Sequence, residues 1–371
     1  MKDLPGQPLR FVVTGGGTGG HLFPGIAVAA SLMRERPGTE ILFIGTERQV
    51  DRDVLGGHPF QTAAIRCQGL KGKSLSGIFT ALWQLPKAVW QAQRILRGFA
   101  PRVVLGVGGY VTGPVLVAAR LLGIPTCIHE QNSVPGLANR LLGRIVERIF
   151  ISLPGSEEYF PANRTILTGN PIRESIAEIR SDTSNAPSEL VLLVLGGSQG
   201  ARRVNQLVSD GLVGAREQLP PGFRVIHQTG STDAAEVGNK YKLAGIKATV
   251  APFFTDMASL YQQAVLVISR AGATSLAEIC LVGCPAILIP YPFAADNHQE
   301  KNGAYVVAGG GALMFLENEL TAEQLAGTVM QLLANHEART RMAECLRGLA
   351  MPRATDTIVA ECLTLGGVSD V

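Results

Sequence analysis

Two glycine-rich segments carry the clearest chemical signal in this chain, because each follows an apolar run and precedes an amphipathic one. The first is Thr14–His21 (TGGGTGGH) and the second is Gly196–Arg202 (GGSQGAR). A glycine-rich turn between a strand and a helix lets backbone N–H groups approach phosphate oxygens, and the helix N-terminus behind it adds partial positive charge. Neither segment has the G-x-x-x-x-G-K-[ST] spacing of a P-loop ATPase. The pair predicts two domains that face one phosphorylated ligand.

A third glycine-rich segment, Gly106–Gly113, follows another expected strand in the first half of the chain. Ligands of parallel α/β proteins bind beyond the carboxyl ends of the strands. Two such loops in one half indicate a diphosphate held by backbone amides, and tight strand–helix packing is the structural alternative.

The run His129-Glu130-Gln131-Asn132 places an imidazole, a carboxylate and two amides directly after an expected strand. These groups suit a hydrogen-bond network with sugar hydroxyls, and His129 or Glu130 could also take a proton. A helix-capping cluster is an equally good interpretation, because Asn132 and Ser133 cap helices well. The residues alone leave both interpretations open.

Two segments of the second half have the composition of a nucleotide-sugar site. Ser269–Glu278 reads as a strand, a tight turn and a helix, and Tyr291–Gln299 reads as a polar loop after a strand. Small residues let a nucleotide approach the backbone, and Glu278 could accept two hydrogen bonds from a ribose diol. A solvated glutamate and an ordinary surface loop are the alternatives.

The pair Asp51 and Asp53 matches the D-x-D pattern by letter only. It lies in a charged stretch, Glu47–Leu55, that we expect to be a solvated helix face. We therefore predict no metal site and no cofactor.

Short apolar runs alternate with helical patterns along the chain, which is typical of parallel α/β architecture. Most runs lack apolar–polar alternation, as expected for strands buried on both faces. One helix is predicted over Gly25–Arg36, with Pro24 marking its first turn. The expected strands are Phe11–Thr14, Ile41–Gly45, Val103–Val107, Thr126–His129, Ile149–Ile151, Val191–Leu195, Arg224–Gln228, Ala248–Ala251, Leu266–Ser269 and Ala286–Ile289.

A turn-rich link at Leu167–Pro171 predicts a boundary between domains over residues 8–168 and 169–349, with the ligand in a cleft between them. Ser181–Ser188 is the most loop-like stretch of the second domain.

The composition fits two well-packed cores in a reducing compartment. The chain has 371 residues, 46% of them hydrophobic and 17% charged, and a net charge of +3 that gives no argument for nucleic acid. The six cysteines show no C-x-x-C pair and no zinc spacing, which favours free thiols. We find no apolar signal segment and no run of about 18 apolar residues, so we expect a soluble cytoplasmic chain.

Seven ordered blocks together resemble the MurG family, bacterial enzymes that make lipid II. The resemblance runs from about Arg10 to about Asp356. One glycine loop is weak evidence, whereas seven blocks in order are strong. They are Gly16–His21, Gly108–Tyr110, His129–Asn132, Gly169–Arg173, Gly197–Arg202, Ser269–Glu278 and Asp296–Gln299.

The resemblance implies a GT-B fold, in which two Rossmann-like doubly wound parallel-sheet domains face a cleft. The N-terminal domain would hold the acceptor and face the membrane, and the C-terminal domain would bind the donor, UDP-N-acetylglucosamine (UDP-GlcNAc). A last helix, about residues 350–366, would pack back on the N-terminal domain.

The resemblance also implies site residues. The acceptor diphosphate would lie at Gly17, Gly108, Gly109 and Tyr110. The backbone of Phe254 would meet the uracil, at a position where family members often carry an aliphatic residue. The other UDP-GlcNAc contacts would be Thr18, Gly19, Gly20, Asn132, Arg173, Ser198, Ala273, Thr274, Ser275, Leu276, Ala277, Glu278 and Gln299.

The reaction implied is an inverting, metal-independent transfer of N-acetylglucosamine to the 4-hydroxyl of lipid I, the undecaprenyl-diphosphate-linked N-acetylmuramoyl-pentapeptide. Arg173, Ser198 and the helix after Gly200 would supply positive potential for the leaving diphosphate. The acceptor hydroxyl needs a base. His21 is the first candidate, because imidazoles titrate near neutral pH, and Glu130 is the second. The sequence leaves this choice open.

Residues 74–96 form an apolar stripe at helical spacings, interrupted by Pro86. A core helix is the commoner explanation of such a stripe. Members of the family bind the inner face of the cell membrane through this region, so the resemblance implies a peripheral membrane protein. The implied membrane residues are Lys71, Lys73, Leu75, Ile78, Phe79, Leu82 and Trp83.

Three other functions remain open at this point. They are a GT-B UDP-sugar transferase with a different lipid acceptor, a UDP-GlcNAc 2-epimerase, and a nucleotide-sugar-binding scaffold without enzymatic activity. An epimerase would need additional catalytic carboxylates around the donor sugar, and a scaffold would not need a candidate base.

Overall fold

The structure is a computed structural model that describes residues 8–16, 19–46, 55–67, 75–179, 189–197 and 200–368. The chain divides into two compact units. The first comprises Met1–Arg173 and Pro352–Val371, and the second comprises Glu174–Met351. The division along the chain falls after Arg173 and again before Pro352.

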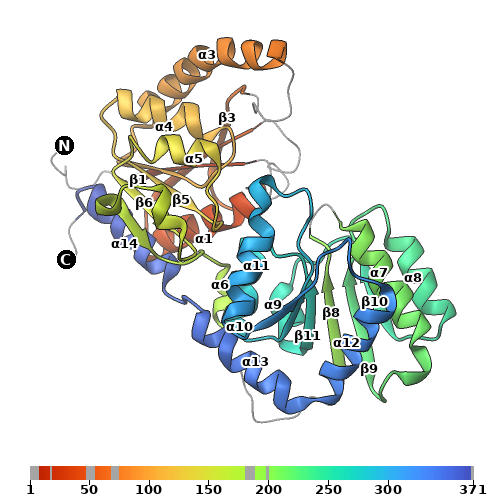
Figure 1. The fold of residues 1–371 in the computed structure, drawn as a ribbon. Coiled ribbons are helices and arrows are strands. Elements are labelled where there is room, and N and C mark those ends of the chain that lie inside the picture. Colours follow the sequence, from red (N-terminus) through yellow and green to blue (C-terminus); the bar gives the residue numbers. More distant parts are fainter. Residues whose placement is uncertain are drawn as a thin grey trace. The chain divides into compact units, whose positions relative to one another are not determined.

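The described part of the first unit contains a seven-stranded parallel sheet with the order β3-β2-β1-β4-β5-β6-β7 (Figure 1). The chain winds outward in both directions from the neighbours β1 and β4. Ligands of doubly wound sheets bind at such a switch point. The strands are β1 (Arg10–Thr14), β2 (Glu40–Gly45), β3 (Gln61–Ala64), β4 (Val103–Gly106), β5 (Thr126–Glu130), β6 (Arg148–Ile151) and β7 (Thr165–Leu167).

Alternate residues of each central strand enter two separate cores. Phe11 and Val13 of β1 pack on one face of the sheet, and Val12 packs on the other. Burial on both faces explains why the strands are apolar without alternation. The helices and 3₁₀ turns of this unit are α1 (Gly19–Glu35), α3 (Leu75–Phe99), α4 (Thr112–Leu121), α5 (Leu137–Leu142), α14 (Ala354–Leu365), η1 (Ser156–Tyr159) and η2 (Ala162–Arg164).

Helices α1 and α14 cover one face of this sheet, and α3, α4 and α5 cover the other. Helix α14 contacts α1 and β4, and Arg148 on β6 forms a 3.1 Å ion pair with Glu361. The last helix of the chain is therefore built into the core of the first unit.

Pro24 and Pro86 both lie inside continuous helices. The sequence instead predicts that Pro24 marks the first turn of its helix and that Pro86 interrupts an apolar stripe. Helix α1 begins at Gly19, six residues before the predicted start, so Pro24 lies inside it. Gly19 and Gly20, which the sequence assigns to the glycine-rich turn, lie in the first turn of this helix. Helix α3 also continues through Pro86 without interruption. Proline has no backbone N–H, so the helix loses one backbone hydrogen bond at this position. Pro86 is exposed, so its ring faces solvent.

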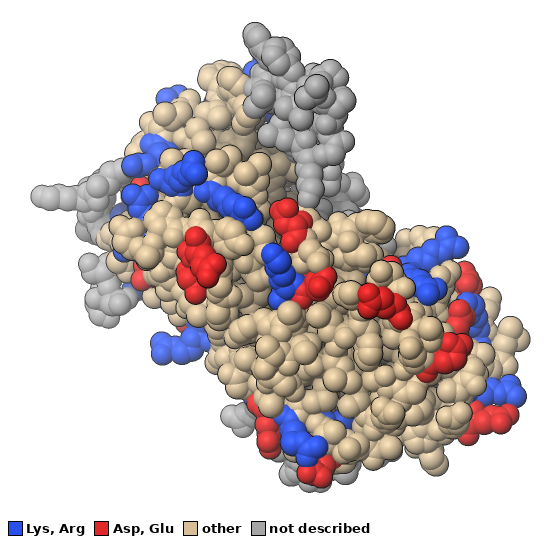
Figure 2. Space-filling view, in the orientation of Figure 1, with Lys and Arg blue, Asp and Glu red and all other residues tan. Residues whose placement is uncertain are grey.

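One side of the first unit carries basic and apolar side chains together. Figure 2 shows Lys and Arg gathered over the region of α4 and α5. Leu137, Leu141 and Ile145 are exposed there by 70%, 53% and 36%, and Arg144 is also exposed.

The described part of the second unit contains a six-stranded parallel sheet with the order β10-β9-β8-β11-β12-β13. Its switch point lies between β8 and β11. The strands are β8 (Leu190–Leu195), β9 (Phe223–Gln228), β10 (Ala248–Ala251), β11 (Ala264–Ser269), β12 (Ala286–Leu288) and β13 (Ala312–Met314).

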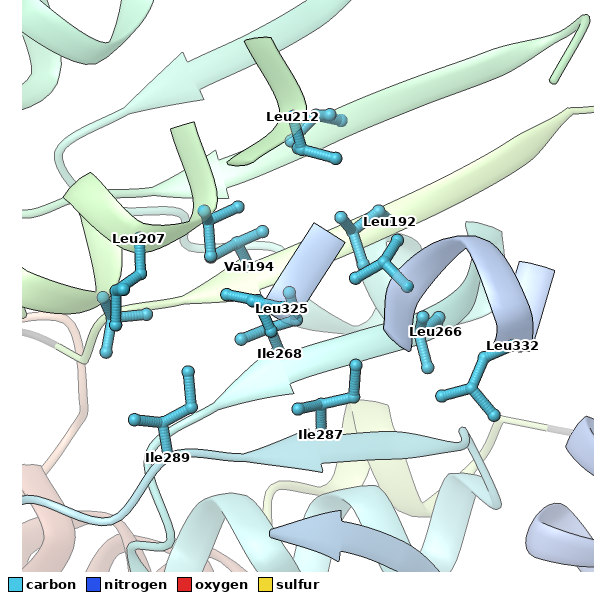
Figure 3. Packing of buried hydrophobic residues seen from close by; sticks show 14 of the residues in the cluster. Leu192, Val194, Leu207, Leu212, Leu266, Ile268, Ile287, Ile289, Leu325 and Leu332 are labelled. Atoms are coloured by element: carbon cyan, nitrogen blue, oxygen red, sulfur yellow. The ribbon is translucent and has the colours of Figure 1, made fainter. Parts of the chain in front are cut away.

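Leucine, isoleucine and valine side chains of β8, β11 and β12 pack against two helices to form the main core of the second unit (Figure 3). Leu207 comes from the helix after the glycine-rich segment, and Leu325 comes from a helix near the end of the unit. The helices and 3₁₀ turns are α6 (Glu174–Ala177), α7 (Arg202–Gly214), α8 (Ala234–Leu243), α9 (Met257–Gln263), α10 (Ala273–Val282), α11 (His298–Ala308), α12 (Ala322–Ala334), α13 (His336–Leu349), η3 (Arg216–Gln218) and η4 (Ala295–Asn297).

Three strands were not predicted: β3, β7 and β13. Each lies at the edge of its sheet. They are only three or four residues long, and β3 is largely exposed. An edge strand needs no continuous apolar run, so the signal that identified the central strands is absent. Among the described residues, no helix is both long and apolar enough to cross a bilayer.

Candidate active site

The glycine loops that follow β1 and β4 touch each other at the switch point of the first unit. A Cβ on Gly109 would overlap the carbonyl oxygen of Gly16, and a Cβ on Gly108 would lie 2.7 Å from Nδ1 of His21. Gly108 and Gly109 also have positive φ angles of 105° and 84°. Only glycine therefore allows the loop backbone to lie against the His21 ring.

His21 projects from the first turn of α1 and is partly buried. Its Nδ1 lies 3.1 Å from Oε1 of Gln131. Within the part of the chain that the structure describes, its Nε2 has no hydrogen-bond partner. This nitrogen can accept a proton from a ligand.

Gln131 connects His21 to a second, fully buried histidine. Its Nε2 lies 2.9 Å from the carbonyl oxygen of Val107 and 3.0 Å from Nδ1 of His129. The other ring nitrogen of His129 lies 3.2 Å from the carbonyl oxygen of Gly169 and 3.0 Å from Oγ of Ser152. Burial lowers the pKa of His129 to about 4, against a smaller opposing effect of the Gly169 hydrogen bond. His129 is therefore neutral at physiological pH.

Glu130 is buried and organises the loop that follows β5. Its Oε1 accepts hydrogen bonds from the backbone N–H and the side-chain amide of Asn132, at 3.0 and 3.2 Å. Its Oε2 accepts from Nδ2 of Asn139 at 2.8 Å and from the backbone N–H of Gly136 at 3.3 Å. Both oxygens are occupied by protein donors, so Glu130 is poorly placed to accept a proton from a ligand. Neither Asn132 nor Ser133 caps the following helix, because the N-cap of α5 is Gly136 and it has no side-chain cap.

Arg173, the last residue of the first segment of this unit, stacks on helix α1. Its guanidinium carbon lies 4.9 Å from the centroid of the Phe23 ring, two residues after His21. Cation–π stacking of this kind restrains the arginine side chain. The first unit thus brings His21, Arg173 and the loop at Gly108 around the N-terminal part of α1.

In the second unit, Glu278 lies on α10 and is 97% buried, so it is not the solvated glutamate of the alternative interpretation. The hydroxyl of the buried Tyr261 donates a 3.1 Å hydrogen bond to its Oε2. Thr274, Ser275 and Ala277, in the first part of α10, are partly buried, whereas the side chains of Ala273 and Leu276 are buried. Leu276 can meet a ligand only through its backbone.

Two glutamines hold the predicted donor loops. Oε1 of Gln228, at the end of β9, accepts a 3.1 Å hydrogen bond from the backbone N–H of Phe254. Oε1 of Gln299 accepts a 2.9 Å hydrogen bond from the backbone N–H of Tyr291. In the loop between Tyr291 and Gln299, Asp296 and Asn297 have φ angles of 52° and 56°. Such strain in consecutive residues other than glycine is concentrated at functional sites.

The second unit also contains a buried histidine with an amide partner. Nε2 of His227 lies 3.1 Å from Oδ1 of Asn205, and its Nδ1 lies 2.9 Å from the hydroxyl of Tyr241. Nδ2 of Asn205 donates to Oδ2 of Asp233 at 2.8 Å and to the carbonyl oxygen of Thr229 at 2.9 Å. Burial lowers the pKa of His227 to about 3. The carbonyl oxygen of Thr229 packs so closely on Gly200 that a Cβ there would lie only 2.5 Å from it.

Several predicted residues fall outside what the structure describes. For Gly19 and for the predicted membrane residues on α3, only the backbone is described; these are Leu75, Ile78, Phe79, Leu82 and Trp83. In the described ranges, no group of three or more His, Cys, Asp and Glu side chains could hold a metal ion. The residues outside the described ranges are Gly17, Thr18, Asp51, Asp53, Lys71, Lys73 and Ser198.

The sequence assigns no role to Gln228 or Tyr261, and it gives Gln131 only as part of a run that suits sugar hydroxyls, not as a partner of His21. One signal for Gln131 was available. Residues i and i+2 of a strand lie on the same side, so His129 and Gln131 share a side at the end of β5, opposite Glu130. The partners of Gln228 and Tyr261 are distant in sequence, and no local pattern identifies them.

Profiles of two protein families match the chain. The "Glycosyltransferase family 28 N-terminal domain" matches residues 11–151, and the "Glycosyltransferase family 28 C-terminal domain" matches residues 191–358. Both matched regions contain the glycine-rich segments described above.

Two curated relatives share the name UDP-N-acetylglucosamine–N-acetylmuramyl-(pentapeptide) pyrophosphoryl-undecaprenol N-acetylglucosamine transferase. The protein of Desulfotalea psychrophila is 51% identical over 96% of both chains. The protein of Syntrophus aciditrophicus is 40% identical over 96% of this chain and 99% of its own.

Solved structures show the same fold. MurG of Acinetobacter baumannii superposes with a TM-score of 0.76 at 31% identity, over 96% of this chain and 100% of that one. UDP-GlcNAc 2-epimerase of Neisseria meningitidis superposes with a TM-score of 0.68 at 14% identity, over 96% and 100% of the two chains. The likeness to the epimerase is one of fold alone.

Proposed function

This chain belongs to the MurG family of glycosyltransferases, and we propose that it transfers N-acetylglucosamine from UDP-GlcNAc to lipid I, giving lipid II for peptidoglycan synthesis. The observation that carries this proposal is the 51% identity, over 96% of both chains, with a relative named for that reaction. The half-buried imidazole beside two glycine loops supports a catalyst rather than a binding scaffold.

The proposed reaction is a single displacement with inversion. The 4-hydroxyl oxygen of the muramoyl sugar forms a bond to C1 of the donor sugar, and the bond between C1 and the β-phosphate oxygen breaks. The electron pair of that bond leaves with UDP, and the hydroxyl proton passes to a base. The products are the β-1,4-linked disaccharide, UDP and a protonated base, which returns its proton to water.

We assign the base to His21 and a structural role to Glu130. Nε2 of His21 accepts no hydrogen bond from a described residue, whereas both oxygens of Glu130 already accept hydrogen bonds from the loop after β5. Through Asn132, Glu130 would still place one of the proposed UDP-GlcNAc contacts.

The second unit is proposed to bind the donor. Glu278 would accept hydrogen bonds from the ribose hydroxyls, with Tyr261 fixing its carboxylate. The backbone of Phe254 would meet the uracil, and Nε2 of Gln299 would reach the sugar while its Oε1 holds the Tyr291 loop. The remaining proposed contacts are Thr18, Gly19, Gly20, Asn132, Arg173, Ser198 and residues 273–277.

The first unit is proposed to bind the acceptor diphosphate at Gly17, Gly108, Gly109 and Tyr110. Because Gly108 and Gly109 lack side chains, the β4 loop packs closely on His21 and Gly16. The backbone N–H groups of this loop would bind the phosphate oxygens. The leaving diphosphate of UDP is a separate charge, which Arg173, Ser198 and the N-terminus of the helix after Gly200 would neutralise, so the proposed transfer needs no metal ion.

The first unit is also proposed to bind the inner face of the cell membrane, where its lipid acceptor resides. Leu137 and Leu141 are four residues apart and lie on one side of α5, and Ile145 follows in the turn after this helix. Arg140 and Arg144 follow the same spacing one residue earlier, which suits anionic headgroups. The apolar stripe of α3 would contribute to the same membrane contact.

Sedimentation with vesicles tests the membrane proposal. Leu137→Ser combined with Leu141→Ser should reduce binding to anionic vesicles and slow turnover of long-chain lipid I, but not of a short-chain analogue. Leu243→Ser is the matched control, because Leu243 is 87% exposed on the second unit. Equal losses for both acceptors, or equal vesicle binding by the double variant and the control, would contradict membrane docking through α5.

Turnover of the purified full-length chain tests the proposed function. UDP release should require both UDP-GlcNAc and a lipid I analogue, and it should be much slower with UDP-glucose. Conversion of UDP-GlcNAc in the absence of acceptor would instead indicate an epimerase.

A further inference from the structure

The side-chain amide of Gln131 can have only one orientation. One of its two terminal atoms lies 2.9 Å from the carbonyl oxygen of Val107 and 3.3 Å from that of His129. Carbonyl oxygens only accept hydrogen bonds, so this atom must be the nitrogen, Nε2. The oxygen, Oε1, therefore faces His21.

This orientation determines which nitrogen of His21 carries the proton. Oε1 of Gln131 has no hydrogen to donate, and it lies 3.1 Å from Nδ1 of His21. A hydrogen bond between them requires the proton to be on Nδ1. In a neutral imidazole the other nitrogen, Nε2, then has the free lone pair.

His129 keeps the amide in place from the other side. Gln131 Nε2 can donate but cannot accept a hydrogen bond, and it lies 3.0 Å from Nδ1 of His129, so Nδ1 of His129 is unprotonated. Its proton is on Nε2, which faces the carbonyl oxygen of Gly169. The low pKa of His129 preserves this arrangement throughout the range in which imidazoles normally titrate.

From this geometry we infer that Gln131 is a positioning residue that holds His21 in the Nδ1–H tautomer, so that Nε2 accepts the proton of the attacking hydroxyl. The inference rests on the proposed role of His21 as base. Gln131 contacts His21 and need not touch either substrate. It acts by excluding the tautomer whose Nε2 already carries a proton and cannot accept another.

Histidine ¹⁵N NMR of the full-length protein measures the tautomer directly. A protonated and an unprotonated ring nitrogen have well-separated shifts, and the chain has only six histidines. The His21 signals are those that disappear in His21→Asn. At a pH where His21 is neutral, we expect the proton on Nδ1 of His21 and on Nε2 of His129. A proton on Nε2 of His21 in the unmodified protein would overturn the inference, and this measurement needs no variant at position 131.

The variant Gln131→Met removes both ends of the amide while nearly keeping the side-chain volume. We expect the His21 proton to move wholly or partly to Nε2 and kcat to fall by about 10- to 100-fold, less than the roughly 10²- to 10⁴-fold effect of losing the base altogether, at a nearly unchanged KM for UDP-GlcNAc. Thr126→Val is the matched control, because it removes one side-chain hydrogen bond, to Glu147, at the opposite end of the same strand β5. It should change neither the His21 tautomer nor kcat.

The combined outcomes separate this inference from the proposed function. A fall in kcat with an unchanged His21 tautomer would show that Gln131 is merely structural, and an altered tautomer with unchanged kcat would show that the tautomer has no catalytic role. Either result would overturn the positioning role. If His21 has the expected tautomer but His21→Ala keeps full activity, the base assignment fails while the tautomer assignment stands.

Discussion

The two units each bury one histidine beside a side-chain amide, but the two networks lead to different places. His129 is connected through Gln131 to the half-buried ring of His21. His227 is connected through Asn205 to the carbonyl oxygen of Thr229, against which Gly200 packs. Burial keeps both histidines neutral. A buried histidine with an amide partner thus leads to the proposed base, His21, in one unit and to a glycine-rich loop in the other.

The comparison shows how to judge a buried histidine. Neither His129 nor His227 is a candidate acid or base itself, because both side chains are fully buried and both resist protonation. The role of each buried histidine depends on the group at the other end of its hydrogen-bond chain. Only the first network ends on a titratable side chain that is partly exposed.

The largest effect is expected where that first network ends. His21→Ala should lower kcat by about 10²- to 10⁴-fold, with little change in the affinity for UDP-GlcNAc, because it removes the proton acceptor. Steady-state kinetics with a soluble lipid I analogue measure this. Glu130→Gln serves as the comparison. A loss of less than about tenfold in His21→Ala, together with loss of the base limb of the pH profile in Glu130→Gln, would reverse our assignment.

In the second unit, the largest effect is expected at Glu278. Glu278→Ala should lower kcat/KM for UDP-GlcNAc by about 10- to 150-fold, since charge-assisted hydrogen bonds contribute roughly 1.5–3 kcal/mol. Acceptor KM should change little. Tyr261→Phe keeps the carboxylate of Glu278 but removes its 3.1 Å hydrogen bond, so it should lower kcat/KM for UDP-GlcNAc by a smaller factor. An unchanged donor KM and kcat in Glu278→Ala would remove Glu278 from the site.

Stability should depend on pH in both units through the same chemistry. Because burial lowers the pKa of His129 to about 4 and of His227 to about 3, the unfolded chain binds these protons first as the pH falls. Their full contribution to stability is present above about pH 6.5 and declines below it, until the loss levels off near each folded-state pKa. Between about pH 7 and about pH 5, protonation linked to each histidine should lower the free energy of unfolding by about 2 kcal/mol.

Urea denaturation of the full chain at the two pH values measures this loss. In His227→Gln, the difference in the free energy of unfolding of the second unit between the two pH values should be smaller by about the contribution of one histidine. If the variant kept the whole pH dependence of the unmodified protein, the neutral state of buried His227 would not be its origin.

The smallest effect is expected from metal removal. Turnover should be the same before and after treatment with EDTA, because Arg173 and the helix N-termini are proposed to carry the diphosphate charge. Loss of turnover that Mg²⁺ or Mn²⁺ restores would contradict this, and Asp51 and Asp53 would then be the first residues to replace.

The sequence predicted the central architecture better than it predicted the roles of single residues. The central strands were recognisable because burial on both faces makes them continuous apolar runs, as in Leu190–Leu195. The glycine segments were recognisable because few residue types tolerate such turns. Glu130 and His21 could not be separated, because their difference lies in hydrogen bonds to Asn139 and Gln131 that form only after folding. The short edge strands lacked a pattern for the same reason, since their pairing depends on neighbours distant in sequence.

The most direct test of the whole account is the structure of the product. With UDP-GlcNAc and a short-chain lipid I analogue, NMR of the product should show one β-1,4-linked N-acetylglucosamine per UDP released. That result is expected of a single displacement in which His21 takes the proton of the attacking 4-hydroxyl. An α-linkage, or a linkage to another hydroxyl of the muramoyl sugar, would contradict it.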